Sequence, residues 1–169
     1  MNINELIMNQ IVPQIKQPNW DSWYIKEKIG AVGFSVVYRV EAQRTSMVDE
    51  AALKISAIVS DRPFSSEDKK KSFLEKQKVS VENETVILKK LRDCSYIVRY
   101  EDEKTEPFYV DGVFEGYYSL IRMELLDPLD RLLYRHKFDY SQANVERLAR
   151  EIGQALQFAH RNGIIHRDI

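Results

Sequence analysis

The chain lacks the features of secreted and membrane proteins. It has one cysteine, Cys94, among 169 residues, so no disulfide can form within it, and a reducing compartment is expected. No apolar run approaches the roughly 20 residues that a membrane-spanning helix needs. Residues 1–10 have neither the basic start nor the apolar core of a secretory signal, and Asn2 stands where N-myristoylation requires glycine. We therefore expect a cytoplasmic protein without a membrane segment.

The chain also lacks an excess of either charge. Its 25 basic and 26 acidic residues give a net charge of −1, which provides no whole-chain argument for a nucleic acid or an anionic membrane as partner. Hydrophobic residues at 44% and charged residues at 30% are ordinary for a soluble globular protein. We find no internal repeat and no low-complexity segment. The length suits one domain or part of a larger one.

The first third of the chain predicts three strands. The runs Trp23–Ile29, Ser35–Val40 and Ala51–Ile55 show alternation or β-branched enrichment. In the third run, Lys54 and its alanine neighbour point to one face and the larger apolar residues to the other. Before these strands, residues 1–20 have apolar residues at helical spacing and two prolines, which fits either a short packed helix or a partly ordered tail.

After Ser65 the apolar period changes to three or four residues, which predicts one helix to residue 91, or two with a break around 78–80. Two further strands are predicted at Tyr96–Tyr100 and Tyr117–Leu125, with an acidic turn over residues 101–107 between them. The remaining elements are predicted as follows: a short helix at Arg131–Arg135, an amphipathic helix between a cap at Ser141 and a stop at Asn162–Gly163, and a very short strand at Ile164–Ile165.

Two oppositely charged residues, Glu84 and Lys54, each lie on a face where the neighbouring side chains are apolar. Glu84 shares the apolar stripe of its helix with Ile87 and Leu88, where a carboxylate is costly unless it is paired. Lys54 on the third strand is its natural partner. The plain alternatives are a solvated lysine at a sheet edge and an ion pair with only a structural role.

Two further motifs carry weaker signals by themselves. Gly30 and Gly33 would suit a turn whose backbone folds over phosphates, although glycine is common in hairpin turns. His166, Arg167 and Asp168 follow a long helix and a glycine stop, where an aspartate can serve as a base in a loop.

In their order along the chain, these motifs resemble the first part of a eukaryotic-type protein kinase domain, from Trp23 to Ile169. The matching segments are AALK at 51–54, ENETVILKKL at 82–91, YIVRY at 96–100, IRMELLD at 121–127 and FAHRNGIIHRDI at 158–169.

The resemblance implies an α+β fold. A five-stranded antiparallel N-lobe with its αC helix would be followed by the first helices of a helical C-lobe. The implied organisation is an N-terminal extension (1–20), an N-lobe with hinge (21–126) and the start of an incomplete C-lobe (127–169).

The resemblance also implies ATP as phosphoryl donor, Mg²⁺ as its companion ion, and a protein hydroxyl, of serine or threonine rather than tyrosine, as acceptor. Lys54 would hold the α- and β-phosphates, Glu84 would fix Lys54, and Asp168 would accept the proton of the substrate hydroxyl. The residues implied at the ATP site are Gly30, Val32, Gly33, Ser35, Val37, Ala52, Lys54, Met123, Glu124, Leu126 and Asp130. Among these, Met123 would be the gatekeeper and Asp130 would meet the ribose.

The sequence departs from the family pattern in two places. Val32 replaces the middle glycine of the Gly-rich loop and disfavours positive φ, so we expect a displaced loop and weaker nucleotide binding. The chain ends one residue after Asp168, and no magnesium ligand of the family occurs in it, so we expect these 169 residues alone to be inactive. The helix from Val145 would lack partners and favour self-association. By the family resemblance, Arg167 before Asp168 implies that phosphorylation of the activation loop controls the parent enzyme.

Two other functions remain open. A pseudokinase or regulatory module would bind nucleotide or protein without catalysis, and Val32 favours it, whereas Lys54, Glu84 and Asp168 speak for catalysis in the parent. A small-molecule kinase of the aminoglycoside phosphotransferase type shares the lobe architecture, but Arg167 and the well-matched αC segment argue against it.

Overall fold

The computed structural model describes residues 2–20, 22–134 and 139–165, which form two compact units. Unit 1 comprises Met1–Thr85 and Glu101–Leu125, and unit 2 comprises Val86–Tyr100 and Leu126–Ile169.

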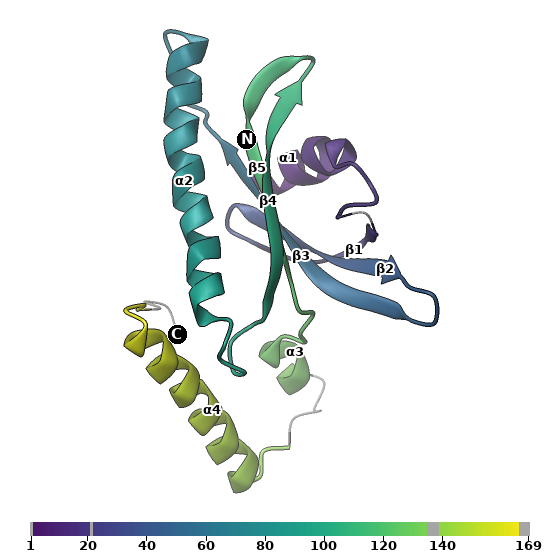
Figure 1. Cartoon of the computed structure of the whole chain (residues 1–169), viewed down its shortest axis with the longest axis vertical. Helices are drawn as coiled ribbons and strands as arrows, with labels where there is room; N and C mark the ends of the chain where they lie inside the picture. Colours follow the sequence, from purple (N-terminus) through teal and green to yellow (C-terminus); the bar gives the residue numbers. More distant parts are fainter. Residues whose placement is uncertain (1, 21, 135–138, 166–169) are drawn as a thin grey trace. The chain divides into compact units, whose positions relative to one another are not determined.

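Unit 1 is built on a five-stranded sheet with the strand order β1-β2-β3-β5-β4 (Figure 1). Strand β1 pairs with β2, β2 with β3, and β3 with β5, all in antiparallel orientation. The predicted fold class, an antiparallel five-stranded sheet with helices, is therefore confirmed. The strands are β1 (Trp23–Val32), β2 (Ser35–Gln43), β3 (Val48–Val59), β4 (Tyr100–Val110) and β5 (Val113–Met123).

The two faces of β3 contact different parts of the chain. Ala51, Leu53 and Ile55 are fully buried in the larger hydrophobic cluster, together with residues of the N-terminal segment. Ile58 shares the opposite face of β3 with Ser56 and belongs to a second cluster with α2. Because side chains alternate along a strand, β3 separates these two clusters.

The N-terminal segment is helical and covers one face of the sheet (Figure 1). It contains α1 (Ile3–Leu6), a π-helical turn η1 (Ile7–Ile11) and a 3₁₀ turn η2 (Val12–Gln14). The side-chain oxygen of Asn2 accepts a hydrogen bond from the Asn4 backbone at 3.0 Å and caps α1. Ile7 and Ile11 have no exposed surface. Of the two readings that the sequence left open, the packed helix is the one observed.

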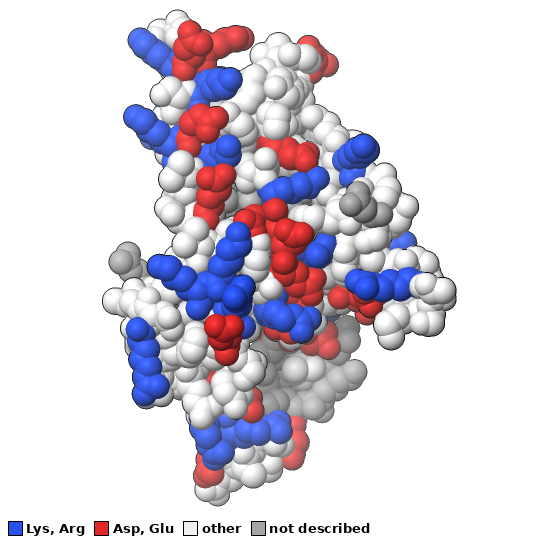
Figure 2. Space-filling model, in the orientation of Figure 1, with Lys and Arg blue, Asp and Glu red and all other residues white. Residues whose placement is uncertain are grey.

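Helix α2 (Glu67–Leu91) is continuous, so the one-helix reading holds. Its unit 1 part packs on the sheet face opposite the N-terminal segment, where Leu74 is buried with Ile58 and Tyr117. Figure 2 shows basic and acidic side chains interspersed along this helix, and Lys78 lies within ion-pair distance of Glu75 and Glu82. The lysines of α2 thus lie beside acidic residues on the face shown.

The fourth strand was placed wrongly by the sequence. The segment 96–99 has no strand in the structure, and the predicted acidic turn 101–107 is itself most of β4. The reason is that β4 is an edge strand, where charged side chains and a proline are tolerated because one side of the backbone has no neighbouring strand. The first strand is also longer than predicted and continues through Gly30 to Val32.

Unit 2 contains the end of α2, then α3 (Leu129–Tyr134) and α4 (Gln142–Arg161). Ser141 is the N-cap residue of α4, but its side chain makes no capping hydrogen bond. Asn162 ends the helix, and Gly163 follows with φ +73°. The predicted strand Ile164–Ile165 is not formed. Within the described part of the chain, no helix has the length and apolar character needed to cross a bilayer.

The N-terminal segment is expected to stabilise unit 1 directly. Replacing Ile11, which is fully buried, with alanine should lower the free energy of unfolding by about 2–5 kcal/mol, because the lost side chain leaves a cavity. Asn9→Ala, at an exposed position of the same turn, is the matched control and should change it by less than about 0.5 kcal/mol. Urea denaturation of both variants tests this. Equal stabilities would show that the segment is not part of the folded core.

A buried tyrosine predicts how stability depends on alkaline pH. The Tyr118 hydroxyl donates a hydrogen bond to Glu106 Oε2 at 2.5 Å, and Lys104 Nζ lies 2.7 Å from Glu106 Oε1. Burial, followed by the hydrogen bond and charge of Glu106, raises the pKa of Tyr118 above its ordinary value.

Because the folded state holds the phenolic proton more tightly, this stabilisation is complete below the unfolded pKa of about 10 and is lost as the pH rises above it. Tyr118→Phe should therefore lose less stability than the wild-type chain between about pH 9 and pH 11. Urea denaturation across this range measures the difference, and parallel curves for the two proteins would contradict it. Tyr117, whose pKa burial raises first and the Glu75 hydrogen bond second, to about 12, is retained in both proteins.

Candidate functional site

The site is centred on an ion pair between the central strand and the long helix. Lys54 Nζ of β3 lies 2.5 Å from Glu84 Oε1 of α2. The lysine side chain is 26% exposed and that of Glu84 is 43% exposed. The structure thus brings these two residues together, but the carboxylate is less buried than its place on the apolar stripe led us to expect. A pair this exposed contributes only about 0–1 kcal/mol to stability. Its importance is therefore that it positions the ammonium group of Lys54.

Strand register places the other predicted sheet residues on the same face as Lys54. Val37 of β2 is directly opposite Lys54, and Met123 of β5 is directly opposite Ala52. Directly opposite residues in an antiparallel pair share a face. Ala52 is buried, whereas Val37 and Met123 are partly exposed. The ammonium group of Lys54 therefore lies next to a small apolar surface formed by Val37, Ala52 and Met123.

The predicted Gly-rich turn is a tight hairpin. Val32 is directly opposite Ser35, so Gly33 and Phe34 are the two turn residues between β1 and β2. Gly33 has φ +54°, a conformation that glycine adopts without strain and that two-residue hairpins require at this position. Gly30 lies within β1 opposite Val37, with open space where a Cβ would be. The predicted loop residues are thus continuous strand and turn.

A cavity of about 320 Å³ lies beside the ion pair, between the hairpin, β3 and α2. The exposed Phe34 stands at its hairpin end, and Glu84 is one of its lining residues. Ser35 and Ser56 line it as well, and their hydroxyl oxygens are 2.7 Å apart. Apart from the carboxylate of Glu84, the lining is mainly small polar and apolar side chains.

The side chains around the ion pair are suited to bind a nucleoside triphosphate. An ammonium group has three donors, and Glu84 Oε1 accepts one of them, so Lys54 retains donors for phosphate oxygens. The apolar surface formed by Val37, Ala52 and Met123 would suit the flat face of a base, and the hairpin turn supplies backbone N–H groups next to the cavity. The donor set therefore matches a phosphate group joined to an apolar ring.

The remaining predicted residues are Glu124, Leu126, Asp130 and Asp168. Glu124 follows the last residue of β5 and is partly exposed. Leu126 and Asp130 belong to unit 2, and the Asp130 carboxylate accepts a hydrogen bond from the Arg131 backbone at 2.7 Å. Asp168 lies outside the described residues.

Among the residues that the structure describes, no group of three or more histidine, cysteine or acidic side chains could hold a metal ion.

Sequence reasoning missed two residues of this site. Ser56 is hydrogen-bonded to Ser35, and Phe34 occupies the turn with 71% of its surface exposed. A signal for Ser56 was present, because it is two residues after Lys54 and so shares its face. Phe34 carried no comparable signal, because a turn residue follows no strand period.

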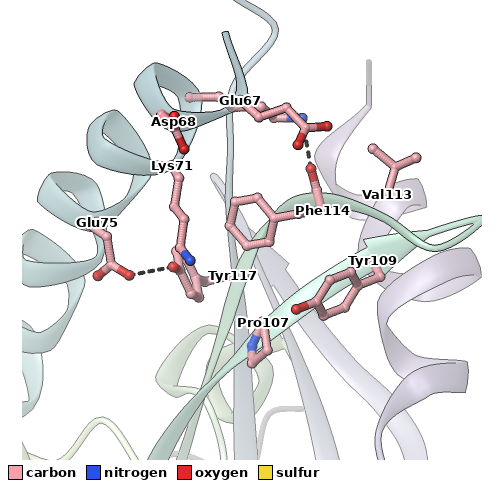
Figure 3. Close-up of a pocket in the computed structure, with 10 residues that line it drawn as sticks. Glu67, Asp68, Lys71, Glu75, Pro107, Tyr109, Val113, Phe114 and Tyr117 are labelled. Carbon is pink, nitrogen blue, oxygen red and sulfur yellow. Dashed lines mark hydrogen bonds between the residues drawn. The ribbon is translucent and has the colours of Figure 1, made fainter.

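A second cavity of unit 1, about 520 Å³, is elsewhere. It lies between the first turns of α2 and the β4–β5 hairpin, as Figure 3 shows. Lys70 of its lining is ion-paired with Glu115 at 2.6 Å, and the Tyr117 hydroxyl donates to Glu75. None of the predicted nucleotide residues lines this cavity, so its size does not make it the candidate site.

Comparisons with known proteins agree with the geometry. A calcium/calmodulin-dependent protein kinase type 1 from Caenorhabditis briggsae is 31% identical over 101 residues, which are 59% of this chain and 25% of that protein. The chain thus matches about a quarter of the length of this relative. A family model described as protein kinase domain matches residues 23–169, which include all five strands of the sheet and helix α2. The chain belongs to the protein kinase domain family.

Proposed function

We propose that the protein is an ATP-dependent protein kinase that transfers the γ-phosphoryl group of ATP to a protein hydroxyl, with serine and threonine as the expected acceptors. The observation that carries the proposal is the ion pair of Lys54 with Glu84 beside a cavity and an apolar strip. The protein acceptor is supported by the family and by the name of the relative, which describes a protein kinase. The activity proposed is that of the whole protein.

Lys54 would bind the α- and β-phosphates through the donors that Glu84 leaves available. Glu84 would hold the ammonium group over the cavity, because a lysine side chain has four flexible carbons and orders poorly without a partner. The base would lie on Val37 and Ala52, and the backbone after Met123 would bond its edge. Asp168 is proposed as the residue that accepts the proton of the substrate hydroxyl. Magnesium would neutralise phosphate charge in the whole protein.

Binding without transfer is the second candidate. Val32 supports it, because a β-branched residue disfavours the positive φ that close approach of backbone and phosphate can need. The 169 residues contain no match to the magnesium-binding motifs of the family, so the proposal is tested on this chain by nucleotide binding.

Replacing Lys54 with methionine should lower the affinity for ATP about ten- to a hundredfold, since a charge-assisted hydrogen bond is worth about 1.5–3 kcal/mol. Lys70→Met is the matched control. Lys70 is likewise an ion-paired lysine of unit 1, 2.6 Å from Glu115, but it lines the other cavity and should leave the affinity unchanged. Calorimetric titration of the 169-residue chain measures both. Equal affinities of the Lys54 variant and the wild-type chain would refute the proposed phosphate contact.

Val32→Gly should raise the affinity for ATP if the loop is displaced by this residue. The expected gain is about two- to tenfold, because glycine adopts the backbone conformations for close approach to phosphate that a β-branched residue disfavours. The same titration measures it, with Ala31→Gly as control for added flexibility. An unchanged affinity would remove the idea that Val32 weakens binding.

A further inference from the structure

Arg122 of β5 is held between two tryptophan rings. Its guanidinium carbon lies 4.8 Å from the ring centre of Trp20 and 4.6 Å from that of Trp23. Its Nε donates to Glu101 Oε2 at 3.0 Å, and its Nη2 lies 4.0 Å from Asp102 Oδ2. The side chain is 13% exposed, so these contacts are largely screened from water and stronger than those of a surface arginine.

The contacts of Arg122 with Trp20 and Trp23, called the clamp below, act on the last two residues of β5. Arg122 is directly opposite Leu53, on the face covered by the N-terminal segment. Met123, the next residue, is directly opposite Ala52 on the face of the ion pair. A single peptide unit therefore joins the clamped side chain on one face to the proposed base-binding surface on the other.

One ring of the clamp comes from outside the matched domain. The family model begins at residue 23, whereas Trp20 precedes it. Trp20 has φ +46°, which is unusual for a residue other than glycine and has to be held by its surroundings. Neighbouring Asn19 is buried and exchanges backbone hydrogen bonds with Trp23 at 2.7 and 2.8 Å. The turn before β1 is thus fixed at both of its ends.

We propose that Arg122 is a positioning residue. Held by Trp20 and Trp23, it fixes the end of β5 and the backbone that follows at Glu124, so recognition of the base depends on the turn before the matched domain. The inference rests on the proposed nucleotide-binding function. Lys54 is on β3, which is also paired with β2, so loosening the clamp should affect binding of the base more than binding of the phosphates.

The test compares ATP with inorganic tripolyphosphate as probes, using calorimetric titration of the 169-residue chain. In Arg122→Met and in Trp20→Leu, the affinity for ATP should fall about three- to tenfold, which is the size of coupling through packed side chains. The affinity for tripolyphosphate should stay within about twofold of wild type. Arg122→Lys keeps the charge but not the planar group between the rings, so it should rescue only part of the loss. Arg44→Met, which removes an arginine ion-paired with Asp49, is the control and should change neither affinity.

Amide hydrogen exchange separates failure of the inference from failure of the proposed function. In Arg122→Lys, which keeps a positive charge beside Glu101, amides of residues 120–125 should exchange faster, and those of residues 36–42 should not. Faster exchange in a chain that binds no ATP would refute the nucleotide function but not the positioning. Unchanged exchange, or equal losses for ATP and tripolyphosphate, would overturn the inference.

Discussion

The structure of unit 1 depends on the fact that both faces of β3 are covered. This strand pairs with β2 and β5, has the N-terminal helical segment on one face, and has α2 on the other. A slip by one residue would turn Lys54 into the cluster around Leu53, where burial of an unpaired charge is costly. The alternation of β3 thus specifies the register and, with it, the face on which the lysine meets Glu84.

The sequence predicted this part because its signals are local. The alternation of Ala51, Leu53 and Ile55 against Lys54 needs only the period of a strand, and Glu84 on an apolar stripe needs only the period of a helix. Their pairing followed from the cost of a charge without a partner. The same reasoning overstated the burial of Glu84, because exposure depends on which neighbours cover the helix, and periodicity contains no information about them.

The elements that the sequence did not predict depend on distant partners. In the sequence alone, the acidic residues from Glu101 onward resemble a turn. In the structure, β5 pairs with one side of this segment, and its other side lies at the edge of the sheet. The N-terminal segment was ambiguous because an isolated helix of this length is marginal in water, and it forms here on an apolar sheet face. The contact of Arg122 with two tryptophans likewise joins residues about a hundred positions apart in sequence.

Unit 1 therefore includes residues that precede the matched domain, and this bears on where ligands can bind. Because Ile7 and Ile11 fill the face of the sheet that carries Leu53, that face holds a packed core. Lys54 and Ser56, two polar side chains of β3, are on the other face, toward α2. A segment that precedes the matched domain thus covers one face of the sheet of unit 1 and leaves the α2 face as the one for the proposed nucleotide site.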